Sequence, residues 1–323
     1  MPSGGLPIRR MPLIASICVA SFLLAGCEAL PKSIASNGSA ATPAAVLVSA
    51  DDWRLTSSGL LRTDDAGKTW HPVENQPAIN YAWGPVASFP DDHSAWVCEQ
   101  GRARGSTSGD VGDTATSASL PARCYVTGDG AKSWTQHDVP STGTATVGRQ
   151  RDDTTVNDID ANDSRTAWIV VGTMSSFAGG GHESISETEL RLLHTRDSGV
   201  HWSTVRDEQA SDSGSSLSPG GAQWVTLGKS GTIYANGFSV GIDRSSDSGR
   251  SWTTIVVPFP PGGEPEGNEY CSLSEEGSSL VVTERELITG VRERFYEAST
   301  DNGTTWMTLS KPASASNHSV PLC

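Results

Sequence analysis

The octapeptide Thr63-Asp-Asp65-Ala-Gly67-Lys-Thr69-Trp70 decides the fold, because its pattern returns along the chain. The pattern is Ser/Thr-x-Asp-x-Gly-x-Ser/Thr-Trp. The other four copies are Thr127-Gly-Asp129-Gly-Ala131-Lys-Ser133-Trp134, Thr195-Arg-Asp197-Ser-Gly199-Val-His201-Trp202, Ser245-Ser-Asp247-Ser-Gly249-Arg-Ser251-Trp252 and Ser299-Thr-Asp301-Asn-Gly303-Thr-Thr305-Trp306. Two copies depart at one position each, with Ala131 replacing Gly and His201 replacing Ser/Thr. Five matches to a pattern that contains Trp indicate a structural repeat.

Each position of this box has a structural reason. The Asp carboxylate and the first hydroxyl accept hydrogen bonds from backbone N–H groups in a tight loop, Gly permits a positive φ, and Trp anchors the following strand. The box therefore predicts a β-hairpin connection, and we expect its aspartates to be structural, the alternative being acids or metal ligands. The residues expected to shape the five turns are Asp65, Gly67, Trp70, Asp129, Trp134, Asp197, Gly199, Trp202, Asp247, Gly249, Trp252, Asp301, Gly303 and Trp306.

The boxes resemble the BNR or Asp-box family, which includes sialidases, sortilin-type receptors and photosystem II assembly-factor propellers. The resemblance covers roughly residues 45 to 310 and implies an all-β propeller, in which each box joins the third and fourth strands of a four-stranded blade. The box aspartates lie between 50 and 68 residues apart, which suits one blade each. Only 17 residues follow Trp306, so we predict five blades, with a six-bladed or open propeller as the alternative.

The N-terminus follows the pattern of bacterial export. Arg9 and Arg10 precede an apolar run that ends in Leu24-Ala25-Gly26-Cys27, which resembles a lipobox, where the Cys receives diacylglycerol and becomes the first mature residue. We predict a lipoprotein signal peptide over residues 1–26, lipidated Cys27 with a flexible tether over 27–45, and the propeller over 46–323. An ordinary signal peptide or a retained signal anchor are the alternatives. The lipid would hold the domain on the extracytoplasmic side of the cell membrane.

The net charge of the chain limits the class of partner that it is expected to bind. The formal net charge of −14 disfavours phosphate backbones and anionic lipid heads, so we expect no nucleic-acid partner.

After export and lipidation four cysteines remain, with three possible pairings. From their expected strand positions we predict disulfides between Cys98 and Cys124 and between Cys271 and Cys323. No CxxC pair occurs, and we expect neither a metal nor a cofactor.

Loop lengths suggest where a ligand would bind. In a propeller the loops between second and third strands lie opposite the boxes. From the second-strand Trp to the box Trp the distance is 17 residues in blade 1, but 38 in blade 2 and 34 in blade 3. Long inserts are thus expected at about 100–121 and 174–187. Such loops often carry binding sites, although Ser/Gly/Thr-rich inserts also occur without function.

Resemblance to sialidases implies an Arg-Ile-Pro motif, two further arginines, a Tyr/Glu nucleophile pair and an Asp acid. The mature chain lacks Arg-Ile-Pro. Tyr296 and Glu297, near Arg292 and Arg294, imitate part of the set, but adjacent strand residues point to opposite faces. We therefore assign no catalytic residue and expect a non-catalytic surface propeller that binds a protein or glycan or aids assembly. An exo-sialidase or another glycoside hydrolase is the alternative.

Overall fold

The computed structural model describes residues 46–50, 52–81, 84–101, 121–141, 151–179, 182–209, 223–237, 241–258, 269–276, 279–288 and 291–309. All of them lie in one compact unit, Pro43–Cys323. The predicted signal peptide, Cys27, the tether and Cys323 lie outside the described residues. Within these ranges, no helix has the length and hydropathy needed to cross a bilayer.

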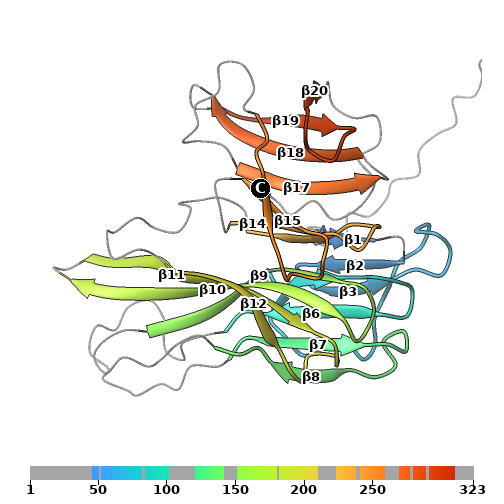
Figure 1. Cartoon of the computed structure of the whole chain (residues 1–323). Helices are drawn as coiled ribbons and strands as arrows, with labels where there is room; N and C mark the ends of the chain where they lie inside the picture. The colour runs from blue at the N-terminus through green and yellow to red at the C-terminus, as the bar shows by residue number, and fades with distance from the viewer. Residues whose placement is uncertain are drawn as a thin grey trace, which may run out of the picture. The chain divides into compact units, whose positions relative to one another are not determined.

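The described strands form five antiparallel four-stranded sheets, arranged as a five-bladed β-propeller (Figure 1). Blades 1 and 2 consist of β1 (Val46–Ser49), β2 (Trp53–Thr56), β3 (Gly59–Arg62), β4 (His71–Pro72), then β5 (Val86–Ser88), β6 (Ala95–Glu99), β7 (Arg123–Thr127) and β8 (Thr135–Asp138). Blade 3 consists of β9 (Arg151–Ala161), β10 (Ala167–Gly179), β11 (His182–Thr195) and β12 (Ser203–Gln209). Blades 4 and 5 consist of β13 (Val225–Leu227), β14 (Ile233–Asn236), β15 (Ile242–Ser245), β16 (Thr253–Ile255), then β17 (Glu269–Glu276), β18 (Ser279–Ile288), β19 (Val291–Ser299) and β20 (Met307–Leu309).

In every blade the strands pair in chain order, and the box connects the third strand to the fourth. The predicted all-β fold and its five blades are therefore confirmed. Repetition made this part predictable, because each box fixes the place of one hairpin.

The apolar core of the described residues lies between blades. Four clusters join blade 1 to 2, 2 to 3, 3 to 4 and 4 to 5. In each cluster the box Trp of the later blade packs against the earlier one; these are Trp134, Trp202, Trp252 and Trp306. Trp70 of blade 1 differs, because the guanidinium of Arg54 lies 3.9 Å from its ring centroid. A box Trp thus fastens its blade to the preceding one.

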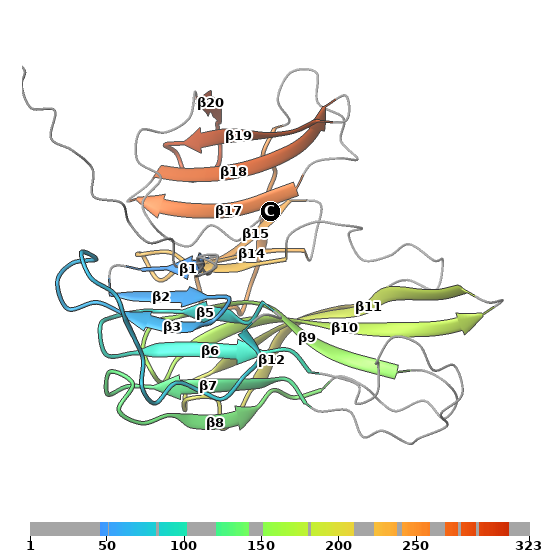
Figure 2. The same cartoon turned by 180° about the vertical axis from the view of Figure 1, so that it is seen from behind.

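One expectation about blade 3 is wrong. We expected residues 174–187 to form a loop insert, but β10 continues to Gly179 and β11 begins at His182. The two strands stay paired out to Gly179 opposite His182. The Ser-rich composition suggested a loop, whereas the continuous antiparallel register makes this segment the arm of a long hairpin (Figures 1 and 2).

Candidate binding face and a tyrosine–glutamate pair

The box carboxylates are engaged inside their own turns. Asp65 Oδ1 accepts hydrogen bonds from Thr63 Oγ1 at 2.7 Å and from the Thr69 N–H at 2.8 Å, and Oδ2 accepts one from Thr69 Oγ1 at 2.7 Å. Asp129, Asp247 and Asp301 have the same three bonds. Hydrogen bonds from the residue four positions later, more than any other cause, lower the pKa of each box aspartate to about 2. These groups hold turns together and offer little to a substrate.

The two departures from the box pattern are accommodated differently. His201 replaces the second hydroxyl, and its Nδ1 lies 2.7 Å from Asp197 Oδ2, so an imidazole nitrogen takes the place of the hydroxyl. Ala131 takes the place of Gly and keeps the left-handed backbone, with a φ of 67°. In the two boxes that carry these changes, the buried indole nitrogens of Trp134 and Trp202 have no hydrogen-bond partner. In the other three boxes the indole donates to the carbonyl of the box Gly.

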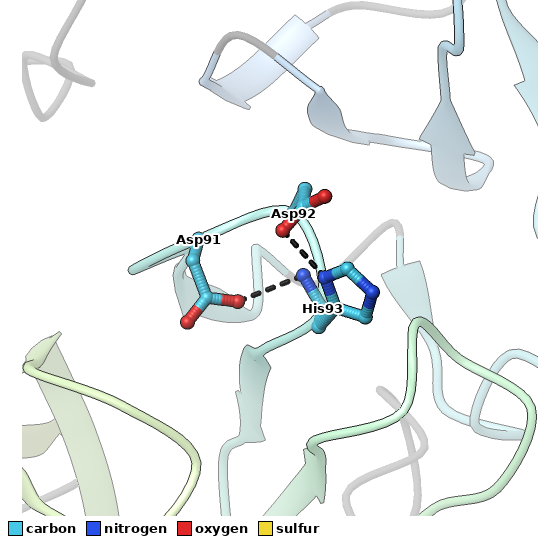
Figure 3. Close-up of side chains that lie close together, drawn as sticks. All are labelled: Asp91, Asp92 and His93. Atoms are coloured by element: carbon cyan, nitrogen blue, oxygen red, sulfur yellow. Dashed lines mark hydrogen bonds and ion pairs between the residues drawn. The ribbon is translucent and has the colours of Figure 1, made fainter.

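Asp91, Asp92 and His93 form the one described group with ligand atoms close enough for a metal, all within 4.8 Å (Figure 3). They lie in the turn between β5 and β6. Asp91 Oδ1 accepts hydrogen bonds from the backbone N–H groups of His93 at 2.7 Å and Ser94 at 2.6 Å. Asp92 Oδ1 lies 2.5 Å from His93 Nδ1. Each acidic group in this turn is therefore already engaged by a neighbour.

The equivalent turn of blade 3 explains this cluster without a metal. Asp163 Oδ1 accepts hydrogen bonds from the N–H groups of Arg165 and Thr166, both at 2.7 Å. The Asp163 carbonyl accepts a hydrogen bond from the Trp96 indole at 2.8 Å, as its counterpart in blade 2 accepts one from Trp53 at 3.1 Å. The blade 3 turn makes these bonds without a second acid or a His. The first aspartate of each turn thus closes the turn and links neighbouring blades.

The opposite face carries the base of the blade 2 insert, between β6 and β7, and residues 102–120 of the insert lie outside the described residues. Its base is fixed by covalent and backbone contacts. The predicted disulfide between Cys98 and Cys124 is present, with 4.0 Å between the Cα atoms, and it joins paired residues of β6 and β7. Gly101 N–H donates to the Thr154 carbonyl at 2.9 Å, which ties the insert to β9. Cys271 is also disulfide-bonded. The pairing of Cys271 with Cys323 stays a prediction.

A tyrosine–glutamate pair lies beside this base. The Tyr125 hydroxyl donates to Glu99 Oε1 at 3.0 Å, from β7 to β6. Burial, with the negative charge of Glu99 next, raises the pKa of Tyr125 to about 12. Tyr81 is buried nearby, and both Tyr125 and Glu99 contribute to raising its pKa after burial itself. Arg123 is held by Asp138, with Nε to Oδ1 at 3.1 Å. The cluster offers one acceptor, one hydroxyl and one cation on a rigid base.

The pair considered from the sequence is not assembled. Glu297 is only 2% exposed and accepts a hydrogen bond from Thr308 Oγ1 at 2.7 Å, while Tyr296 is half-buried. The side chains of Arg292 and Arg294 are outside the description. Sequence reasoning missed the Tyr125–Glu99 pair because the two residues are separated by the insert and meet only through the pairing of β6 with β7.

Two acidic residues of β9 form a second feature that the sequence analysis missed. Asp158 Oδ2 accepts a hydrogen bond from the Val225 N–H at 3.0 Å, and Asp160 Oδ2 accepts one from the Leu227 N–H at 2.8 Å. The two aspartates are two residues apart on β9, and the N–H groups that they accept from are two residues apart on β13. The spacings match because side chains and backbone groups on one side of a β-strand recur at every second residue. Although Asp158 as a whole is half-buried, burial of its carboxyl raises its pKa to about 8. In the sequence, the Asp158-x-Asp160 pattern was the signal that could have indicated these two contacts.

No family model matches the chain, and no curated protein matches it either. Similar solved structures include a GH74 xyloglucanase from Xanthomonas campestris, at 14% identity and a TM-score of 0.46, over 84% of this chain and 39% of the other. YCF48 from Cyanidioschyzon merolae has 14% identity and a TM-score of 0.41, over 83% and 86%. The sialidase Hz136 from a Hadza microbial source has 15% identity and a TM-score of 0.42, over 77% and 50%. The chain thus spans half or less of the two enzymes.

Proposed function

We propose that this protein is a non-catalytic, lipid-anchored surface propeller that binds a protein or glycan partner through the face opposite the boxes. The contrast between its two faces is the observation that carries the proposal. The boxes are short turns whose polar groups bond to one another, whereas the opposite face bears the disulfide-based insert and the long β10–β11 hairpin. A rigid scaffold with elaborated loops on one face is typical of a binding protein.

The membrane is part of this proposal through Cys27. A diacylglycerol anchor followed by a tether of about 18 residues would keep the propeller near the bilayer and let its face turn toward partners. The chain's formal charge of −14 favours a neutral or basic partner and disfavours nucleic acid. No cofactor or metal is needed for this function.

A deletion tests which face binds. Residues 102–120 are replaced by two glycines, which keeps Cys98 and Cys124, and the purified protein is used to capture partners from the cell envelope. A matched control replaces the same residues with a Gly/Ser sequence of equal length, and a second control changes exposed Lys68 on the box face to Ala. We expect both insert variants to remain folded and lose a partner that the Lys68→Ala protein retains. Equal capture by all variants would contradict the proposal.

The Tyr125–Glu99 hydrogen bond favours a second candidate, a glycoside hydrolase of sialidase type. A carboxylate within hydrogen-bond distance of a hydroxyl is the geometry of an activated nucleophile. Against this, the pKa of Tyr125 is raised to about 12, and Arg123 is already paired with Asp138. We expect no turnover of a fluorogenic sialoside by the wild-type protein. Turnover that disappears in Tyr125→Phe would establish the enzyme and exclude the non-catalytic function.

A further inference from the structure

The box of blade 5 contains the dipeptide Asn302-Gly303, and no other box contains Asn-Gly. Asn302 is exposed to solvent and has a left-handed φ of 57°. The equivalent residues of the other boxes also have a positive φ; they are Ala66, Gly130, Ser198 and Ser248. Asn accepts this conformation more readily than most residues, but Ala and Ser hold it here as well. The turn therefore does not require a side-chain amide at this position.

An Asn-Gly dipeptide can lose ammonia without an enzyme. The Gly303 nitrogen attacks Cγ of the Asn302 side chain, the new N–Cγ bond closes a succinimide ring, and the Cγ–Nδ2 bond breaks. Ammonia leaves with the proton of the Gly303 N–H. Water then opens the ring at either carbonyl, which gives an aspartate or an isoaspartate at position 302. Glycine favours the ring closure because it has no Cβ to obstruct the approach.

One hydrogen bond restrains the attacking nitrogen within the box. The Gly303 N–H donates to Ser299 Oγ at 2.7 Å, and this bond must break before the nitrogen reaches the Asn302 side chain. The main-chain carbonyl of Asn302 accepts a hydrogen bond from Arg244 Nη1 at 3.5 Å, which leaves the exposed side-chain amide to react. The Ser299 hydroxyl therefore determines how often the nitrogen is free to attack.

The described residues contain one other Asn-Gly dipeptide, Asn236-Gly237, and it is held in place. Asn236 is only 6% exposed, and its Nδ2 donates to the Tyr270 carbonyl at 3.4 Å. Its main-chain N–H donates to the Trp224 carbonyl at 2.9 Å. A buried amide that donates a hydrogen bond does not rotate freely onto the next nitrogen. The two dipeptides thus have the same chemistry but a different exposure.

We propose that Asn302 is a site of spontaneous deamidation in the folded chain and that Ser299 is the residue that restrains the reaction. Isoaspartate places one more carbon in the main chain before Gly303, so the turn loses the spacing on which its hydrogen bonds depend. The Trp306 indole donates to the Gly303 carbonyl at 3.1 Å and packs against blade 4. The lengthened turn therefore loosens the interface between blades 4 and 5. This inference is independent of the proposed binding face.

The test incubates the full chain in neutral buffer and follows deamidation by mass spectrometry of its peptides. We expect Asn302 to deamidate at least about tenfold faster than Asn236. Ser299→Ala should accelerate the reaction at Asn302 at least about threefold, because it removes the restraining hydrogen bond. Ser299→Thr keeps the hydroxyl, as in three other boxes, and should leave the rate unchanged. The matched control is Thr195→Ala, which removes the same bond to Gly199 in blade 3 and should not alter the rate at Asn302.

Asn236 reports whether blade 5 stays folded, because its amide is bound to Tyr270 of that blade. In Ser299→Ala, a rise at Asn302 alone supports the inference, whereas no rise, or an equal rise at both asparagines, overturns the role of Ser299. Asn302→Gly cannot deamidate and carries the residue that blade 2 has there, Gly130. It should keep its melting temperature on incubation, while the wild type loses stability. The inference is overturned if Asn302 stays as intact as Asn236, or if both proteins lose equal stability.

Discussion

Replacing the glycines of two boxes with Ala should separate backbone strain from crowding. Gly67 and Gly249 occupy the same box position with φ values of 81° and 84°. A Cβ on residue 67 would meet nothing nearer than 3.5 Å, whereas one on residue 249 would lie 2.5 Å from Val205 Cγ1 and 3.2 Å from a ring atom of Trp168. Ala131 already stands at this position in blade 2 with a φ of 67°. The backbone itself therefore accepts Ala.

The expected magnitudes follow from these two contributions. A left-handed conformation costs Ala about 1–2 kcal/mol, which is the whole effect expected for Gly67→Ala. Crowding against Val205 adds about 1–3 kcal/mol to Gly249→Ala, because a packed interface cannot yield freely. Urea unfolding followed by tryptophan fluorescence measures both free energies, provided that the m-values agree.

A double variant identifies the cause of the difference. Combining Gly249→Ala with Val205→Ala removes the crowded methyl, so the two changes together should destabilise by about 1 kcal/mol less than the sum of the single changes. Equal losses from Gly67→Ala and Gly249→Ala, or strict additivity with Val205→Ala, would refute the reasoning. The comparison also shows whether the turns of blades 1 and 4 tolerate change differently.

Three further predictions concern charge, covalent links and anchoring. The raised pKa of Asp158 means that its contribution to the free energy of unfolding is complete below about pH 4 and is lost as the pH rises towards 8. Asp158→Asn should therefore gain stability relative to the wild type over that pH range, as measured by melting curves at several pH values. Parallel pH dependences of the two proteins would contradict this. Replacing Cys98 and Cys124 with Ala removes a disulfide of sequence separation 26 and should lower the free energy of unfolding in urea by about 3.5 kcal/mol. If reducing the wild-type disulfide left this free energy unchanged, the disulfide would be contradicted. Cys27→Ala should prevent both lipidation and cleavage before residue 27, so the intact mass should show residues 1–26 still attached and no diacylglycerol. An unchanged mass would reject the lipid anchor.

The fold was predictable because its decisive signal is local and repeated. Each box needs only eight consecutive residues to place a turn, and the turn places the strands on either side. Cys98 and Cys124 were pairable for the same reason, since the strands that carry them are neighbours in one blade. A hairpin arm was harder to predict, because the Ser-rich stretch around residues 174–187 has a loop-like composition and only its register with the neighbouring strand makes it regular.

The candidate site was less predictable because it depends on contacts between distant segments. Glu99 and Tyr125 lie at the two ends of an insert, so neither residue points to the other in the sequence. Asp158 and Asp160 bind backbone groups 67 positions away, and backbone donors leave no trace in residue types. Adjacent Tyr296 and Glu297 looked like a pair in the sequence, yet the buried Glu297 bonds to Thr308 across the sheet.

The location of the core between blades has a consequence for how the chain is made. No described cluster is confined to a single blade, so a newly emerged blade has nothing to cover its later face until the next one arrives. The blades would then fold in the order of synthesis, because the box Trp of each new blade covers the apolar face of the preceding blade. A chain that stopped after blade 4 would leave Tyr234, Ile242 and Val257 without the residues of blade 5 that bury them. Premature termination should therefore yield aggregation-prone fragments with exposed apolar surface instead of smaller folded propellers.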